Sequence, residues 1–151
     1  MKNFTTSIDI SAPADRVWEV MSEVEQWHEW TPSITSIRRL DSGQFNVGSK
    51  AIVRQPKFPP ALWKVTSIEP GKNFVWVSGG PGIHVTGSHT VEPTSTGSRA
   101  TLFVTYEGLF GGIFARMTQA ITQRYIEYEA RGLKARSEDP GYHHRGFTGQ
   151  S

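Results

Sequence analysis

The chain opens with a strand pattern and then changes to a helical one. Over residues 4–11 apolar and polar side chains alternate, which is the period of a β-strand with one buried face. Ser11 then offers a candidate helix N-cap, and Pro13 suits the first helical turn. Apolar residues follow at helical spacing: Val17, Val20, Met21 and Val24. The pattern predicts one strand followed by a short helix.

Two tryptophans three residues apart, Trp27 and Trp30, mark a second short helix that ends at Pro32. Residues at this spacing share a helix face, so the two rings either pack in the core or form a wall of a ligand site. Trp30, next to the helix end, is the better candidate for the rim of a cavity. A metal site on His28 and Glu29 is disfavoured, because adjacent helix positions diverge and no second histidine follows at the spacing of a zinc helix.

Residues 34–108 are divided at regular intervals by clusters of turn residues. These clusters are DSGQFNVGS, EPGKN, GGPG and EPTSTGS, with short alternating runs between them. Such punctuation is typical of an antiparallel meander. A long helical pattern, GGIFARMTQAITQRYIEYEARGLKAR, follows. Five of its large side chains recur three or four residues apart and predict a packing face: Phe114, Met117, Ile121, Tyr125 and Tyr128.

The turns also predict how the strands pair. Tight closure pairs Ile68 with Asn73, Ser78 with Ile83 and Val91 with Leu102. In this register the large apolar residues gather on one face of the sheet: Trp63, Val65, Phe74, Trp76, Ile83, Val85, Val91, Leu102, Val104 and Tyr106. The long helix is the natural cover for that face. Gly87 and His89 lie on it too, and a glycine in mid-strand indicates a bend or a close approach.

Composition narrows the class of protein. The 151 residues are enough for one domain with a real core. The 16 basic and 14 acidic residues are too balanced to favour nucleic-acid binding. The chain has no cysteine, which excludes disulfides and thiolate metal sites. We find no signal-peptide pattern and no apolar run of membrane length, so we expect a cytoplasmic protein without stable membrane insertion. The glycine-rich, aperiodic residues 137–151 predict a flexible or extended tail.

The motifs and their order resemble a known superfamily. The segments that carry the likeness are SIDISAPADRVWEVMSEVEQWHEWTPSI, WKVTSIEPGKNFVWVSGGPG, GSHTVEPTSTGSRATL and the closing helix. The likeness extends over residues 3–136. Within them Ala12-Pro13 precedes Val17-Trp18, the two tryptophans precede Pro32, and a hairpin carries the EPG triplet. In these features the chain resembles the START-like, Bet v 1-like (SRPBCC) superfamily, in particular its polyketide cyclase/dehydrase and lipid-transport branch.

The resemblance implies an α+β helix-grip fold. A curved, seven-stranded antiparallel sheet would wrap around a long C-terminal helix, with two short helices after the first strand. Residues 1–136 would form this single domain. Members of the superfamily bind lipids, polyketides or hormones, and a minority catalyse cyclisation or dehydration. They share no universal catalytic residue, so fold alone leaves the function open.

We expect a small, largely hydrophobic ligand, such as a lipid, polyketide or aromatic metabolite, between the sheet and the long helix. Ligand pockets are mostly apolar with a few placed polar groups, and the candidate wall residues fit that description: Trp30, Phe58, Trp63, Trp76, His89, Tyr106, Phe114, Met117, Ile121 and Tyr125. The loop RQPKFPPALW, which carries Phe58, is a candidate cover for the entrance.

Two alternatives to a simple binding role stay open. A cyclase- or dehydratase-like enzyme would use His89, with Tyr106, to move protons, although the chain has no recognisable catalytic motif. A co-chaperone-like interaction module would have a filled interior and an exposed apolar patch. We expect no cofactor and no metal, because His84 and His89 point to opposite faces of their strand. A monomer and a homodimer are both compatible with the sequence.

Overall fold

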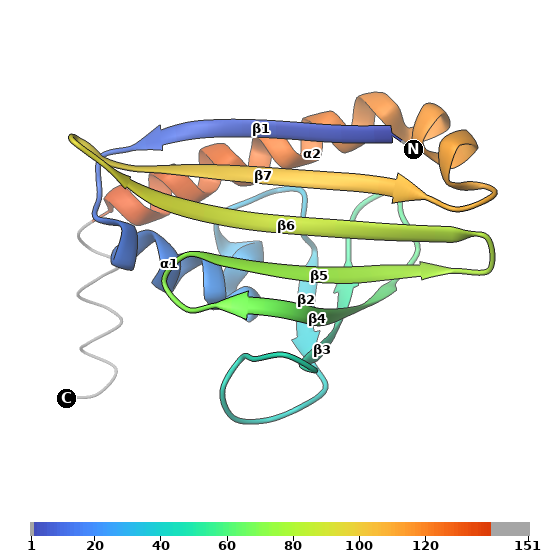
Figure 1. Ribbon diagram of the computed structural model, residues 1–151, viewed down its shortest axis with the longest axis horizontal. Coiled ribbons are helices and arrows are strands. Elements are labelled where there is room, and N and C mark those ends of the chain that lie inside the picture. Colours follow the sequence, from blue (N-terminus) through green and yellow to red (C-terminus); the bar gives the residue numbers. More distant parts are fainter. Residues whose placement is uncertain (1, 140–151) are drawn as a thin grey trace.

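A computed structural model describes residues 2–139 (Figure 1). Within this range one sheet is built of seven antiparallel strands in the order β1-β7-β6-β5-β4-β3-β2. The elements in chain order are β1 (Lys2–Ile10), α1 (Ala14–Ser22), the 3-10 helix η1 (Val24–Glu29), β2 (Ser36–Arg39), β3 (Lys50–Arg54), β4 (Ala61–Glu69), β5 (Asn73–Gly80), β6 (Ile83–Thr94), β7 (Gly97–Glu107) and α2 (Gly111–Glu138). The predicted helix-grip architecture is confirmed.

The long helix α2 lies along one face of the sheet, behind β1 and β7 in Figure 1. It packs against both strands and against α1, while η1 packs against β2. The first strand and the last helix are thereby brought together, and the sheet and α2 enclose the core between them. No helix within residues 2–139 is both long enough and apolar enough to cross a bilayer.

The hairpin between β4 and β5 corrects the predicted register by one residue. Ile68 pairs with Phe74 rather than with Asn73. A bulge between Val65 and Ser67 shifts the ladder by one residue. On the side of the bulge away from the turn, Val65 pairs with Trp76, as predicted from the sequence. The bulge adds one residue to β4 and so changes the alternation of faces across it: Ile68 lies on the face of Phe74, and Ser67 on the opposite face.

The next two hairpins are displaced from the prediction by two residues each. Ser78 pairs with Val85 and not with Ile83, and Val91 pairs with Ala100 and not with Leu102. Both hairpins close in tighter turns than expected, with Gly80 opposite Ile83 in the first. Because side chains alternate with a period of two, a shift of two keeps every residue on its predicted face. The predicted division of faces therefore holds.

The ends and the orientation of the helices differ from expectation. The N-cap position of α1 is Pro13, without a side-chain hydrogen bond, so Ser11 is not the cap. Trp30 lies just beyond η1 and does not belong to it. At the other end α2 continues to Glu138, two residues past the predicted domain end at 136. The rest of the predicted tail, residues 140–151, lies outside the described residues.

The buried face of α2 is rotated from the predicted aromatic stripe. Met117 is 80% exposed, although Tyr125 is buried as predicted. The buried positions of the helix are mostly small or polar: Gly111, Ala115, Thr122, Tyr125, Ile126, Glu129, Ala130, Gly132, Leu133 and Ser137. A hydrophobic stripe misses such a face, because alanine, threonine and glutamate add little to the apolar pattern.

Candidate ligand-binding site

Two adjoining cavities lie between the sheet and α2. We call the one of about 80 Å³ the inner cavity and the one of about 310 Å³ the outer cavity. Five residues line both: Gln55, Phe58, Trp63, Val85 and Tyr106. These five residues therefore lie at the boundary between the two cavities.

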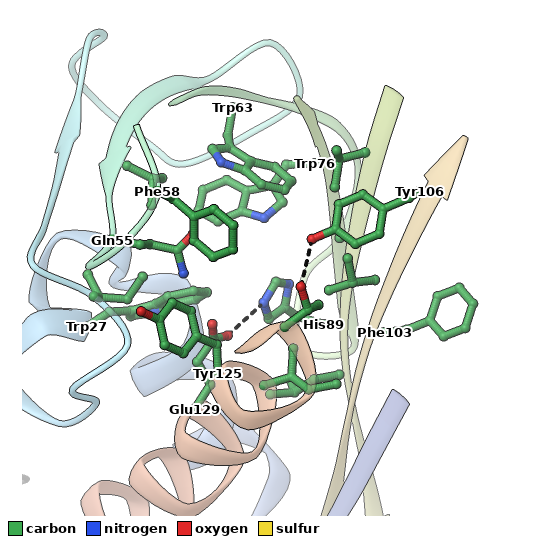
Figure 2. Close-up of a pocket in the computed structure, with 18 residues that line it drawn as sticks. Trp27, Gln55, Phe58, Trp63, Trp76, His89, Phe103, Tyr106, Tyr125 and Glu129 are labelled. Atoms are coloured by element: carbon green, nitrogen blue, oxygen red, sulfur yellow. Dashed lines mark hydrogen bonds and ion pairs between the residues drawn. The ribbon is translucent and has the colours of Figure 1, made fainter. Parts of the chain in front are cut away.

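The inner cavity has an aromatic wall with a small number of polar groups (Figure 2). Trp63 and Trp76 are neighbouring rings on this wall, with 5.4 Å between centroids. Apolar residues complete the lining: Trp27, Ile34, Val53, Val85, Leu102, Val104 and Ile126. The ring of Phe103 points away from the cavity in Figure 2, as expected for a residue next to Leu102 on the same strand.

Gly87 makes room for this wall. It pairs with Trp76 across the β5–β6 ladder, and a Cβ atom added at Gly87 would lie 3.2 Å from Cδ1 and Nε1 of Trp76. The same atom would lie 3.5 Å from the ring of Trp63. The predicted close approach at Gly87 is confirmed. It is an approach between a side chain and the neighbouring backbone, which only glycine leaves open.

His89 is held in a cage of aromatic rings. Its imidazole stacks on Phe74, with 4.6 Å between centroids and 6° between planes, and it lies 5.1 Å from the centroid of Trp27. The residue is only 7% exposed. Its Nδ1 atom is buried and has no hydrogen-bond partner within residues 2–139. Buried polar atoms in proteins are nearly always paired, so this nitrogen is an exception to the rule.

Glu129 is the polar residue that sequence reasoning missed. It lies on the buried face of α2, is 9% exposed, and its Oε1 lies 3.7 Å from Nε2 of His89 (Figure 2). That separation exceeds a hydrogen bond. A signal for Glu129 did exist, because it stands one helical turn after Tyr125, which was assigned to the packing face. Charged residues are seldom buried, so the predicted face of large apolar and aromatic side chains does not include this position.

Tyr106 begins a chain of hydroxyl groups along α2. Its Oη lies 3.1 Å from Oγ1 of Thr122, which in turn lies 3.4 Å from Oγ1 of Thr118. Thr118 donates to the carbonyl of Phe114. Burial raises the pKa of Tyr106, outweighing the hydrogen bonds that lower it. The phenol is thus kept neutral at the boundary of the two cavities.

The loop between β3 and β4 is tied down over the cavities at two points. Tyr125 donates a hydrogen bond from its hydroxyl to the carbonyl of Pro56, and Gln55 donates from Nε2 to the carbonyl of Ser33. Phe58 lies between them, 5.8 Å from the ring of Tyr125. Pro59 and Pro60 line the outer cavity. The loop that carries Phe58 therefore forms part of the wall of both cavities.

Seven of the ten residues predicted as pocket walls line at least one of these cavities: Phe58, Trp63, Trp76, His89, Tyr106, Phe114 and Tyr125. The other three, Trp30, Met117 and Ile121, line neither cavity. Met117 is exposed and Ile121 half-buried, because α2 is rotated from the predicted stripe.

Trp30 packs against Trp27 and α2 and does not line either cavity. Its ring lies 5.6 Å from that of Trp27, and its backbone carbonyl rests on Gly132 of α2. Trp27 is the tryptophan that reaches the inner cavity, and its Nε1 donates to the carbonyl of Met21. An ion pair between Arg136 and Glu29 adds a further link between α2 and η1. Trp27 therefore lines the inner cavity, and Trp30 packs against the core and α2.

An exposed apolar patch lies where β7 turns into α2. It consists of Leu109, Phe110, Ile113 and Met117, each at least half exposed. Such a patch is what the interaction-module alternative requires. The same alternative requires a filled interior, and the inner and outer cavities do not fit that condition.

Comparison with known proteins identifies the family. Residues 1–138 match the family model described as "Polyketide cyclase / dehydrase and lipid transport". The chain belongs to this family. Its membership confirms the resemblance found in the sequence and places the protein in the START-like, Bet v 1-like superfamily. A search of curated proteins gave no match to the chain.

Solved structures of polyketide cyclase/dehydrase-like and related proteins share the fold. The hypothetical protein jhp0584 of Helicobacter pylori matches with a TM-score of 0.78 and 11% identity over 91% of this chain and 88% of that chain. The Zhui aromatase/cyclase from Streptomyces sp. R1128 matches with a TM-score of 0.73 and 16% identity over 91% and 93%. Ara h 8.0201 matches with a TM-score of 0.71 and 14% identity over 90% and 97%. These likenesses show the helix-grip fold.

Family and fold together support a general role in binding a hydrophobic small molecule. The cavities agree with that role in position and in lining, since they lie between sheet and helix and are mainly aromatic.

Proposed function

We propose that the protein binds an apolar small molecule, a lipid, polyketide or aromatic metabolite, in the inner and outer cavities. The observation that carries the proposal is the pair of adjoining cavities with five lining residues in common. The outer cavity alone has the volume of a small ligand pocket. The inner cavity takes the narrow end of the ligand, next to His89 and Glu129.

The ligand enters under the loop that carries Phe58. This loop and Phe114 border the outer cavity, and the two rings lie 6.2 Å apart. Phe58 also lines the inner cavity, so its rotation is the simplest movement that joins the two spaces. Burial of aromatic walls against an apolar ligand removes water from both and supplies the driving force.

Native mass spectrometry of freshly purified protein, followed by denaturing extraction, tests the proposal. We expect a defined apolar molecule, or thermal stabilisation by members of a lipid and polyketide panel, because a ligand present well above its Kd stabilises the fold. Val85 lines both cavities, and Val85→Phe should abolish binding. Val77→Phe is the matched control, since Val77 pairs with Lys64 on the other face of the sheet. A protein that is empty and unresponsive to the whole panel contradicts the proposal.

A second candidate function, a cyclase- or dehydratase-like enzyme, is favoured by one observation. His89 and Glu129 place an imidazole and a carboxylate side by side in an apolar cavity, an arrangement suited to general acid–base chemistry. His89→Gln should then abolish turnover of a polyketide substrate and leave its binding intact. Unchanged turnover in this variant would exclude His89 as an acid or base.

A further inference from the structure

The hydroxyl groups around the inner cavity already donate their hydrogen bonds within the protein. Thr118 donates to the carbonyl of Phe114, and Thr122 donates to Thr118. The short contact between Tyr106 and Thr122 is therefore a donation from the phenol. Tyr125 likewise donates to the carbonyl of Pro56. Each tyrosine oxygen can then only accept a hydrogen bond from a ligand.

His89 and Glu129 lie side by side in the lining of the inner cavity, with Nε2 of His89 facing Glu129. The other imidazole nitrogen, Nδ1, is buried and has no partner within residues 2–139. Glu129 has His89 as its polar neighbour, at a distance too long for a hydrogen bond. The carboxylate of Glu129 therefore lacks a donor.

Donors in the lining are few, and two of the residues that carry them already donate within the protein. The indole of Trp27 donates to the carbonyl of Met21, and Gln55 donates to the carbonyl of Ser33. The indoles of Trp63 and Trp76 keep their N–H groups, on the wall opposite Glu129 in Figure 2. The end of the cavity formed by His89 and Glu129 is therefore rich in acceptors and poor in donors.

We infer that the ligand is an apolar molecule with a hydrogen-bond donor, an ammonium or a hydroxyl group, at its inner end. Glu129 accepts the hydrogen bond from this group. An apolar enclosure makes an unpaired carboxylate costly, and a donor on the ligand removes that cost. An ammonium gains further from the ring of Trp27, which lines the same cavity next to His89, because cations are attracted to aromatic rings. This inference names the ligand class for the proposed function and rests on it.

Four matched probes test the inference by calorimetric titration: naphthylethylamine, naphthylethanol, the methyl ether of that alcohol, and ethylnaphthalene. They share the same apolar body and differ in the polar end. We expect the amine to bind about tenfold or more tightly than ethylnaphthalene, because hydrogen bonds to a charged group are stronger than those between neutral groups. The alcohol should lie between them. The ether, which has an acceptor and no donor, should bind no better than ethylnaphthalene.

Variants at Glu129 separate this inference from the proposed function. Glu129→Leu should bind ethylnaphthalene and lose the preference for the amine, and Glu129→Gln should retain only a small part of it. Glu127→Gln is the matched control, because Glu127 lies on the same helix outside both cavities and bonds to Gln123. Equal affinity for the amine and ethylnaphthalene in the unchanged protein overturns the inference alone. Failure of every probe to bind overturns the proposed function as well.

Discussion

The indole of Trp76 packs directly against Gly87 on the neighbouring strand. The two residues are paired in the β5–β6 ladder, and a Cβ atom at Gly87 would lie only 3.2 Å from two atoms of the indole. Trp76 also contacts Trp63 on the same wall. The absence of a side chain at Gly87 therefore sets where the aromatic wall lies, and with it the width of the inner cavity.

Gly87→Ala should push Trp76 into the inner cavity and weaken ligand binding. The added methyl group would lie closer to the indole than an ordinary van der Waals contact allows, so the indole must shift by a few tenths of an ångström. The effect on stability should stay within about 1 kcal/mol, because reduced freedom of the unfolded chain offsets part of the strain. Titration with ethylnaphthalene measures the affinity. Thr86→Ala, at the next position on the opposite face, is the control, and equal affinity in both variants would contradict the role of Gly87.

Gly132→Ala should destabilise the protein by about 1–3 kcal/mol or more. A Cβ atom at Gly132 would lie 2.0 Å from the carbonyl oxygen of Trp30, which is backbone and cannot turn aside. Urea unfolding measures the change. Gly112→Ala in the same helix meets nothing within 4 Å, and it should raise stability slightly, because alanine favours helix. A similar result for both substitutions would show that Gly132 of α2 is not in close contact with the backbone of Trp30.

Tyr125→Phe should loosen the loop that covers the cavities. It removes the hydrogen bond to the carbonyl of Pro56 but keeps the ring that packs on Phe58. We expect a loss of about 1 kcal/mol of stability and faster amide hydrogen exchange at Gln55, Lys57 and Phe58, the non-proline residues of this loop. Tyr128→Phe is the matched control, since no hydrogen bond of the Tyr128 hydroxyl is found within residues 2–139. Unchanged exchange in the Tyr125 variant would mean that this bond does not hold the loop.

The raised pKa of Tyr106 should make the protein less stable at alkaline pH. Burial raises the pKa of this phenol above its ordinary value of 10.0. In the unfolded chain the phenol loses its proton first, so the folded state binds more protons above about pH 10 and stability falls as the pH rises. Tyr106→Phe removes this contribution. Thermal unfolding at several pH values between about 7 and 11 should show a shallower alkaline decline for the variant, and an identical decline would contradict the assignment.

The fold could be predicted from the sequence because its signals are redundant. Three turns, the alternation of the strands and the long helical pattern all indicate one sheet with one buried face. The register errors at Ile83 and Ala100 were both of two residues, and alternation cannot detect an even shift. Loop closure decides that detail, and it depends on how tightly Gly82 and its neighbours turn.

The walls contributed by the sheet were easier to predict than those contributed by the helix. Trp63, Trp76 and His89 followed from strand parity alone. On α2 the cavity side carries Thr122, Ile126 and Glu129, of which only one is apolar. A helix that faces a partly polar cavity has no continuous hydrophobic stripe on its inner face. The predicted aromatic stripe of α2 therefore includes Met117, which is exposed.

The central claim is that an apolar ligand occupies the space between the sheet and α2. The five tryptophans of the chain give a direct test, because each indole N–H gives its own signal in a nitrogen–proton correlation spectrum. Addition of ethylnaphthalene should shift the signals of Trp63 and Trp76, which line the cavities, and leave that of Trp18, which lines neither. Shifts confined to Trp18, or no shift at any concentration of the probe, would contradict the claim.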